Sequence, residues 1–273
     1  KIGRIDQRAG GAANVARNIA SLGGKAGLLS VTGDDEAANA LDALMAQDGV
    51  ASYLMRDKQI ATTVKLRVVA RNQQLIRLDF EEHPNREVLE QIKQKYREVL
   101  PEYDAIIFSD YGKGGLSHIS DMIDWAKHAG KTVLIDPKGD DYEKYAGATL
   151  ITPNRAELKE VVGSWKNESE LTEKAQNLRR HLDLTAVLLT RSEEGMTLFS
   201  EGEPIYQPTR AQEVYDVSGA GDTVIAGVGL GLAAGYTMPE AMHLANTAAG
   251  VVVAKLGTAV CSFAELNKAL EEQ

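Results

Sequence analysis

The chain has 273 residues, of which 44% are hydrophobic and 25% charged, and its formal net charge is -9. The acidic balance excludes a typical nucleic-acid-binding protein, whose surface is normally basic, and a single cysteine, Cys261, excludes an internal disulfide framework. No apolar run reaches the roughly 18 residues that a membrane-spanning helix needs, so we expect a cytoplasmic enzyme of small molecules, with no nucleic-acid or membrane partner.

Short β-rich segments alternate with helical segments, which is typical of a mainly parallel sheet covered by helices. The predicted core strands are Ala26–Val31, Ala105–Ser109, Thr132–Asp136, Thr149–Thr152 and Ala186–Thr190. The predicted helices are Ala12–Leu22, Ala37–Gln47, Arg86–Leu100, Ser117–Ala129, Arg155–Val162, Glu168–His181, Gly219–Ala234, Pro239–Leu256 and Phe263–Glu271. Ligands of open α/β sheets bind beyond the carboxyl ends of the strands, so the polar residues that follow these strands mark the expected site.

One segment, Thr62–Phe80, interrupts this alternation and predicts two long strands joined by a polar turn near residues 72–73. Its period-two pattern gives one polar face, which carries Lys65, Arg67, Arg77 and Asp79. Such a face is either the solvated side of an antiparallel ribbon or the inner side of a lid that closes over a charged substrate.

The segment Asp216–Asp222 reads Asp-Val-Ser-Gly-Ala-Gly-Asp and precedes an apolar, glycine-rich stretch. We expect the backbone N–H groups of its small residues at the N-terminus of a buried helix, where orphan donors and the helix dipole attract anions. Asp222 at that place suits a general base beside a transferring phosphate. The alternative is an ordinary helix start, because Ser and Asp are common capping residues.

Two further motifs lie at predicted helix starts. Gly10 and Gly11 precede the first helix, and Asn14, one turn further on, can offer donors and an acceptor to sugar hydroxyls. Asn154 and Glu157 are three residues apart at another helix start and therefore share one face. They can position Mg²⁺ through its waters, although a simple helix entry with an acid in its first turn has the same pattern.

These three motifs, in this order, resemble those of the ribokinase-like (PfkB) family of carbohydrate kinases, and the resemblance covers essentially the whole chain. It implies an α/β fold of the ribokinase-like type: three α/β/α layers, a mainly parallel central sheet and a small β-lid. Residues 1–273 are then a single kinase domain with a lid hairpin around 62–82. The implied cofactors are ATP and Mg²⁺, with a monovalent cation as a further candidate, and the implied assembly is a homodimer paired through the lid.

Several segments look more narrowly like the heptose 7-phosphate kinases of bacterial lipopolysaccharide-core synthesis: Arg8–Ala16, Thr63–Val68, Arg71–Glu82, Ser109–Gly114, Asp136–Gly139 and Val253–Thr258. This implies ATP-dependent phosphorylation of the anomeric hydroxyl of D-glycero-D-manno-heptose 7-phosphate, which gives the 1,7-bisphosphate on the route to ADP-heptose. The His-x-Gly-His motif of a nucleotidyltransferase is absent, so kinase activity alone is expected. The strand with a sugar-binding Asp that family members usually carry before the Gly-Gly motif does not fit into the nine residues ahead of Gly10.

The resemblance also implies roles for the matching residues. Asp222 is the expected base, and the backbone of Gly219, Ala220 and Gly221 is the expected anion hole. The expected nucleotide side comprises Asn154, Glu157 (the magnesium residue, through water), Thr190, Ser192, Glu193, Gly195 and Asn246, with Val214 and Val253 as apolar walls. The expected sugar side comprises Gly10, Gly11, Asn14 and Asp110, and the candidates for the 7-phosphate are Lys65, Arg67, Arg77 and Lys113.

Three alternatives stay open. A kinase of the same fold could act on a fructose phosphate, a pentose or a nucleoside, although a neutral sugar does not require the basic lid residues. A sugar-binding protein on a kinase fold is a second alternative, but a pure binder needs no base at Asp222. A dinucleotide-dependent oxidoreductase is the third, and its glycine fingerprint would belong near the first strand, not near the end of the chain.

Overall fold

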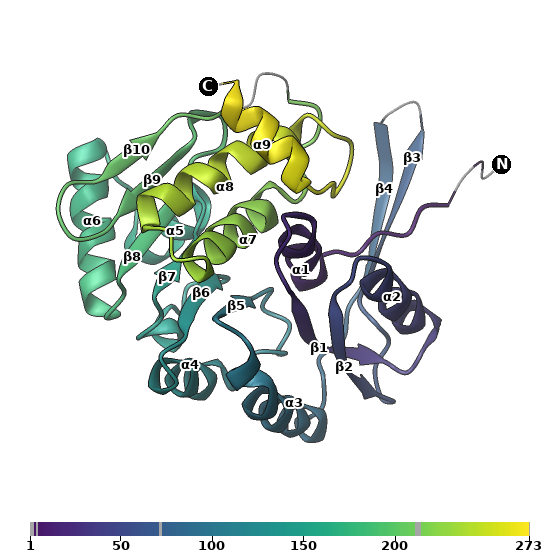
Figure 1. Ribbon diagram of the computed structural model, residues 1–273. Coiled ribbons are helices and arrows are strands. Elements are labelled where there is room, and N and C mark those ends of the chain that lie inside the picture. The colour runs from purple at the N-terminus through teal and green to yellow at the C-terminus, as the bar shows by residue number, and fades with distance from the viewer. Residues whose placement is uncertain (1–2, 4, 71–72, 211–213, 273) are drawn as a thin grey trace.

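The computed structural model describes residue 3 and residues 5–70, 73–210 and 214–272. Figure 1 shows an α/β body with helices on both sides of a sheet and a long hairpin that projects from it. The strands are β1 Gly27–Gly33, β2 Ala51–Asp57, β3 Val64–Ala70, β4 Gln73–Phe80, β5 Ala105–Ser109, β6 Thr132–Asp136, β7 Leu150–Ile151, β8 Ala186–Thr190, β9 Met196–Phe199 and β10 Ile205–Gln207. The α-helices are α1 Ala12–Ser21, α2 Glu36–Gln47, α3 Arg86–Val99, α4 Ile119–His128, α5 Arg155–Val162, α6 Glu168–His181, α7 Ala220–Ala233, α8 Met238–Val253 and α9 Phe263–Glu271.

The central sheet has six strands in the order β10-β9-β8-β7-β6-β5. Strands β5 to β8 pair in parallel, and β9 and β10 add an antiparallel edge. Strands β1 and β2 form a separate parallel pair. The mainly parallel sheet that the alternation predicts is therefore present, and its parallel strands bring the carboxyl ends of β5 and β6 to one edge.

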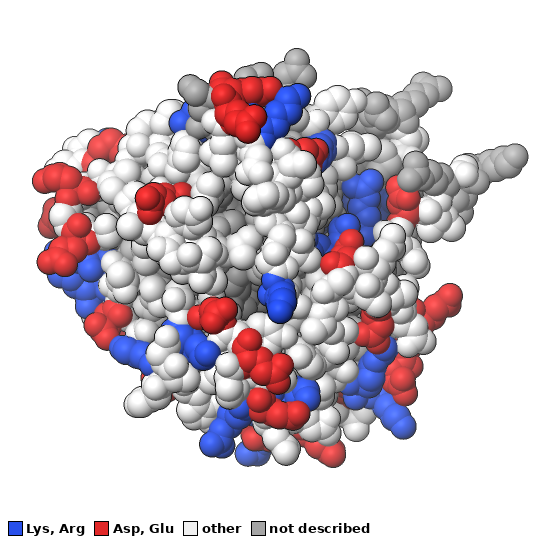
Figure 2. Space-filling model, in the orientation of Figure 1, with Lys and Arg blue, Asp and Glu red and all other residues white. Residues whose placement is uncertain are grey.

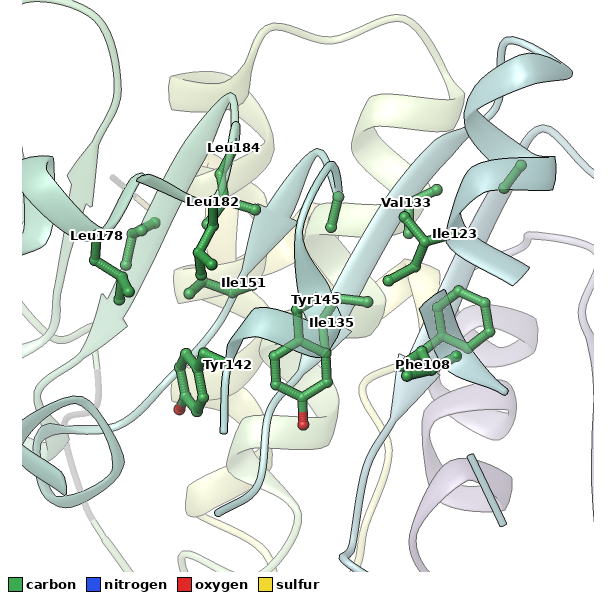
Figure 3. Packing of buried hydrophobic residues seen from close by; sticks show 14 of the residues in the cluster. Phe108, Ile123, Val133, Ile135, Tyr142, Tyr145, Ile151, Leu178, Leu182 and Leu184 are labelled. Atoms are coloured by element: carbon green, nitrogen blue, oxygen red, sulfur yellow. The ribbon is translucent and has the colours of Figure 1, made fainter. Parts of the chain in front are cut away.

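Apolar side chains project from both faces of the central sheet, which is why its strands are continuous apolar runs in the sequence. Along β6, Val133 and Ile135 pack in the cluster with α3, α4 and α6, whereas Leu134 packs on the opposite face with α7 and α8. Figure 3 shows part of the first cluster, with Ile135 of β6 and Tyr145 among its labelled residues. This double cover holds the strand ends in fixed positions.

Polar side chains fix several helix starts. The Asn85, Asn154 and Asn167 side chains each accept a hydrogen bond from the backbone N–H three residues on, at the starts of α3, α5 and α6. Glu157 and Glu265 return the bond in capping boxes at α5 and α9. Each cap satisfies backbone donors that no helix can satisfy by itself.

Strands β3 and β4 form the antiparallel hairpin predicted from Thr62–Phe80 (Figure 1). Lys65 pairs with Asp79 and Arg67 with Arg77, so these four residues share one face, as the period-two pattern predicts. The structure starts β4 at Gln73, which the sequence places in the turn, and the other turn residue, Asn72, lies outside the described residues. We call this hairpin the lid.

The structure differs from the predicted elements in several places. Strands β2, β9 and β10 were not predicted. Strands β9 and β10 are short, and the sequence of β2 has no clear alternation of apolar and polar residues. Strand β7 contains only Leu150–Ile151 of the predicted Thr149–Thr152, and α8 ends at Val253 instead of Leu256. Within the described ranges, no helix is long and apolar enough to cross a bilayer.

Candidate active site

The start of α7 combines a left-handed glycine with free donors. Gly219 caps the helix in the left-handed conformation, with φ of 81°, and a Cβ atom there would lie 2.8 Å from Asn14 Nδ2. The N–H groups of Gly219 and Gly221 have no acceptor among the described residues, whereas that of Ala220 donates to the Val217 carbonyl oxygen at 3.1 Å. Of the three expected anion donors, Ala220 is therefore already engaged in this arrangement.

Asp222 is the one charged residue of α7, and two side chains hold its carboxylate. Asn14 Nδ2 donates to Oδ2 at 2.7 Å, and the Tyr111 hydroxyl donates to Oδ1 at 3.4 Å. Burial raises the pKa of Asp222, while these two donors oppose the rise. A half-buried carboxylate with a raised pKa is suited to accept a proton. Figure 2 shows few other charged side chains on the surface over α7 and α8.

Helix α1 supplies Asn14, one of the two partners of the Asp222 carboxylate, and a second hydrogen bond ties α1 to α7. Asn18 Oδ1 accepts from the Thr223 hydroxyl at 3.0 Å, and Asn18 Nδ2 donates to the Asn14 carbonyl at 2.9 Å. Asn14 is fully buried, and its Oδ1 atom finds no hydrogen-bond partner among the residues that the structure describes. The contacts of Asn18 with Thr223 and of Tyr111 with Asp222 were not predicted from the sequence, because they join segments that are far apart in the chain.

Gly11 and Gly10 differ in their surroundings. Gly11 caps α1 with φ of 56°, and a Cβ atom there would lie 3.1 Å from the Tyr111 ring. Gly10 is exposed, and a Cβ atom there would meet nothing within 4 Å. Gly11 thus brings the backbone against Tyr111, whereas Gly10 makes no comparable approach.

Asp216 ties the segment before α7 to a second loop. Its carboxylate accepts from the backbone N–H groups of Ser218 at 2.9 Å and Gly257 at 2.8 Å. Burial opposes ionisation, but these backbone donors hold the pKa of Asp216 below its ordinary value. The carboxylate is therefore a fixed brace that keeps the α7 N-terminus in place.

Asp110, which follows β5, is held by donors of the protein itself. Lys144 Nζ and the Tyr145 hydroxyl each donate to Oδ2 at 2.7 Å, and the Gly112 N–H donates to Oδ1 at 2.8 Å. Although burial disfavours the charge, these donors lower the pKa of Asp110. Its ion pair thus orients the loop that carries Tyr111.

Asp136, the last residue of β6, lies in the site although the sequence analysis assigns it no role. Burial, the carboxylates of Asp222 and Glu157 and, more weakly, that of Asp110 raise its pKa to about 7. Four acids from β5, β6, α5 and α7 therefore lie near one another at the carboxyl edge of the sheet. The signal in the sequence is an Asp at the carboxyl end of a buried strand.

Asn154 and Glu157 form the capping box at the start of α5. Glu157 N–H donates to Asn154 Oδ1 at 3.0 Å, and Asn154 N–H donates to Glu157 Oε2 at 3.0 Å. Glu157 Oε1 also pairs with Lys138 Nζ at 3.1 Å. No group of three His, Cys, Asp or Glu side chains able to hold a metal occurs in the described part of the chain. Mg²⁺ prefers to keep several of its waters and to take few direct carboxylate ligands.

The other expected nucleotide residues lie around β8 and α8. Thr190 ends β8, and Ser192, Glu193 and Gly195 form the turn into β9, where Gly195 has φ of 100°. Asn246 is buried in α8 and donates to the Pro208 carbonyl at 2.8 Å. Val253 is buried and Val214 exposed. Among the described residues, no hydrogen bond or ion pair joins these residues to the Asp222 carboxylate, whose partners are Asn14 and Tyr111.

The cationic candidates gather around the lid. Lys65 on β3 and Lys113, from the loop after β5, both pair with the carboxylate of Glu81. Arg77 makes a two-point contact with Asp79, at 2.8 and 2.6 Å. The structure thus brings Lys65 and Lys113 together, which their separation in sequence did not reveal.

Replacing Gly219 with Ala is expected to lower the free energy of unfolding by about 1–3 kcal/mol, because a Cβ atom adds left-handed strain and meets Asn14. Urea denaturation measures the change. Gly221→Ala is the matched control, since a Cβ atom at Gly221 meets nothing within 4 Å. Equal losses in both variants would contradict this account of Gly219.

Comparisons with known proteins show the family of the chain. A family model described as pfkB family carbohydrate kinase matches residues 1–264. The bifunctional protein HldE of Chromohalobacter salexigens is 53% identical over 271 residues, which are 99% of this chain and 57% of that protein. The D-beta-D-heptose 7-phosphate kinase of Bordetella bronchiseptica is 49% identical over 97% of this chain and 85% of that protein. The chain therefore spans somewhat more than half of the length of the bifunctional relative.

Solved structures show the same fold. Phosphofructokinase-2 from Escherichia coli in complex with potassium has a TM-score of 0.79 at 22% identity, covering 96% of this chain and 86% of its own. Arabidopsis thaliana ribokinase complexed with ribose and ATP has a TM-score of 0.74 at 20% identity, covering 95% and 86%. The ribokinase-like α/β fold expected from the sequence is confirmed, and the chain belongs to the pfkB family of carbohydrate kinases.

Proposed function

We propose that this chain transfers the γ-phosphoryl group of ATP to the anomeric hydroxyl of D-glycero-D-manno-heptose 7-phosphate. The product is the 1,7-bisphosphate, an intermediate of ADP-heptose and lipopolysaccharide-core synthesis in the cytoplasm. The carrying observation is Asp222 at the start of α7, with Asn14 and Tyr111 on its two carboxylate oxygens. The name of the Bordetella relative supports the choice of sugar.

In the proposed reaction, Asp222 accepts the proton of the anomeric hydroxyl as that oxygen attacks the γ-phosphorus. The free N–H groups of Gly219 and Gly221 face the negative charge that grows on the transferring group. Asn14 orients the base, and Gly10, Gly11 and Asp110 border the sugar. Lys65, Arg67, Arg77 and Lys113 supply the positive charge for the 7-phosphate.

We assign ATP to the side of the site formed by Asn154, Glu157, Thr190, Ser192, Glu193, Gly195 and Asn246, with Val214 and Val253 as walls. Asp136 and Glu157 offer the oxygen ligands that Mg²⁺ prefers, largely through its waters. When bound, Mg²⁺ neutralises charge on the phosphates. A monovalent cation is a further candidate cofactor, because a solved neighbour binds potassium.

The test is ADP release from Mg²⁺–ATP with heptose 7-phosphate, fructose 6-phosphate, fructose 1-phosphate, ribose and adenosine. Release with the heptose phosphate alone supports the proposal. Turnover with another sugar keeps the kinase chemistry and refutes the substrate. Tight ATP binding without turnover on any of them favours a non-catalytic binding protein.

We further propose that residues 1–273 act as one kinase domain that pairs as a homodimer through its lid. The lid face opposite the cations is apolar and 37–53% exposed, and it comprises Val64, Leu66, Val68, Ile76, Leu78 and Phe80. Pairing of two such faces would remove them from water, which is the main driving force of association.

Leu78→Glu is expected to convert the dimer to a monomer, because it places a charge in the centre of this apolar face. Light scattering after size exclusion measures the mass. Leu75→Glu is the matched control, because Leu75 lies on the same strand and is exposed but is skipped by the pairing at an irregularity of the hairpin, outside the apolar face. A monomeric parent protein, or a dimer that survives Leu78→Glu, would contradict the proposal.

A further inference from the structure

The carboxylate of Glu81 lies between two lysines that come from different parts of the fold. Glu81 directly follows β4, and its Oε1 atom is 3.3 Å from the Nζ atom of Lys65 on β3. Its Oε2 atom pairs with Lys113 in the loop between β5 and α4. This one side chain therefore connects the lid to the body.

The surroundings keep Glu81 ionised. The Lys113 ammonium, followed by that of Lys65, holds the pKa of Glu81 below its ordinary value against the effect of burial. The Glu81 side chain is 19% exposed, whereas those of Lys65 and Lys113 are 37% and 46% exposed. The carboxylate is thus the inner member of the cluster, and both cations remain open to solvent.

The charges of the cluster do not cancel. One carboxylate serves two ammonium groups, which leaves an excess of one positive charge at this point of a chain with a net charge of -9. Arg77 differs, because Asp79 already binds it in a two-point contact. Of these three cations, Lys65 and Lys113 are therefore the two that share a single carboxylate.

The loop after β5 joins the cluster to the site, because it carries both Lys113 and Tyr111. Lys113 is two residues from Tyr111, whose hydroxyl contacts Asp222. A sugar whose anomeric hydroxyl meets Asp222 would extend past Tyr111 toward the lid. A phosphate at its other end would meet the two lysines.

We propose that Glu81 is a resident anion in the phosphate subsite and that the phosphate of the substrate displaces it from Lys65 and Lys113. The inference rests on the proposed function for the identity of the sugar. A phosphate monoester carries a charge of about -1.5 to -2 at neutral pH and offers three acceptor oxygens, so it matches two ammonium groups better than a carboxylate does. A neutral sugar or a monoanion cannot replace Glu81 with a gain, and Glu81 thereby selects doubly charged substrates.

The test measures binding of inorganic phosphate at pH 7.5 by titration calorimetry, without turnover. Glu81→Gln keeps the shape of the side chain and removes the competing charge, so we expect phosphate to bind about fivefold more tightly, the size expected from one exposed ion pair. Glu82→Gln is the matched control: it makes the same change one residue further on, where the carboxylate accepts from the Ala61 N–H. The double variant Glu81→Gln/Lys113→Met should lose the gain, which places the bound phosphate at the lid and not at the α7 N-terminus.

Unchanged or weaker phosphate binding in Glu81→Gln would overturn the inference, because Glu81 would then not compete with phosphate. An equal gain in Glu82→Gln would also overturn it, because the gain would then reflect only the loss of one negative charge near the lid. Kinetics separate this result from failure of the proposed function. If the parent protein does not phosphorylate heptose 7-phosphate but Glu81→Gln gains phosphate affinity, the subsite stands and the sugar assignment fails. If the parent turns over the heptose phosphate and Glu81→Gln gains nothing, the reverse holds.

Discussion

Replacing Asp222 with Asn is expected to lower kcat by about 10²–10⁴-fold, the range that a positioned general base contributes. Asn has nearly the same shape as Asp, so the packing against Asn14 and Tyr111 is kept. The amide, however, can no longer accept the proton of the substrate. We expect KM for both substrates to change much less than kcat, because the base interacts with the transferring proton only in the transition state.

Steady-state ADP release at several sugar concentrations gives kcat and KM separately. Asp183→Asn is a suitable control, since Asp183 pairs with Lys127 on the surface and contacts none of the site residues described above. Retention of more than a tenth of the parent kcat in Asp222→Asn would refute Asp222 as the base. A rise in KM alone would make it a binding residue.

The pH dependence of the reaction should reflect the same carboxylate. Burial raises the pKa of Asp222, so the proton-accepting form is lost as the pH falls through this raised value. The acidic limb of kcat/KM in the parent protein is therefore expected above the ordinary range of an exposed aspartate. Asp222→Asn should leave residual activity without this limb.

Local patterns predicted much of the scaffold. The helices over Arg155–Val162, Glu168–His181 and Phe263–Glu271 have the predicted bounds, because capping residues mark their starts. The strands Ala105–Ser109 and Thr132–Asp136 do so as well, because continuous apolar runs end in polar residues. Strand β2 has neither a cap nor a buried apolar run, so no local pattern predicts it.

The site was predictable in its motifs but not in its contacts. Gly219 and Asp222 were singled out as candidate site residues from the local pattern of small residues and Asp ahead of an apolar helix. The Tyr111 contact to Asp222 spans 111 residues of sequence, and the Asn14 contact spans 208, so only the packing of α1, α7 and the β5 loop creates them. The same holds for Glu81, whose two lysines meet only when the lid lies against the body.

Asp136→Asn is expected to raise the free energy of unfolding above pH 7 in magnesium-free buffer, by at most about 4 kcal/mol. The folded protein holds the pKa of Asp136 at about 7, through burial and the nearby Asp222 and Glu157, whereas the unfolded chain has an ordinary aspartate. Between these two values the folded state binds the extra proton, so rising pH destabilises it until the pH passes about 7. Asn does not ionise, so the variant should equal the parent near pH 4 and exceed it at pH 8.

Urea denaturation at pH 4.5 and pH 8 measures this difference. Asp121→Asn is the control, because Lys93 lowers the pKa of Asp121, and loss of this exposed pair should change stability slightly and in the opposite direction. A constant difference between Asp136→Asn and the parent across the pH range would contradict the raised pKa. A bound cation favours ionised carboxylates, so Mg²⁺ should stabilise the parent more than Asp136→Asn. That result would support Asp136, whose charge destabilises the metal-free protein, as a part of the proposed Mg²⁺ site.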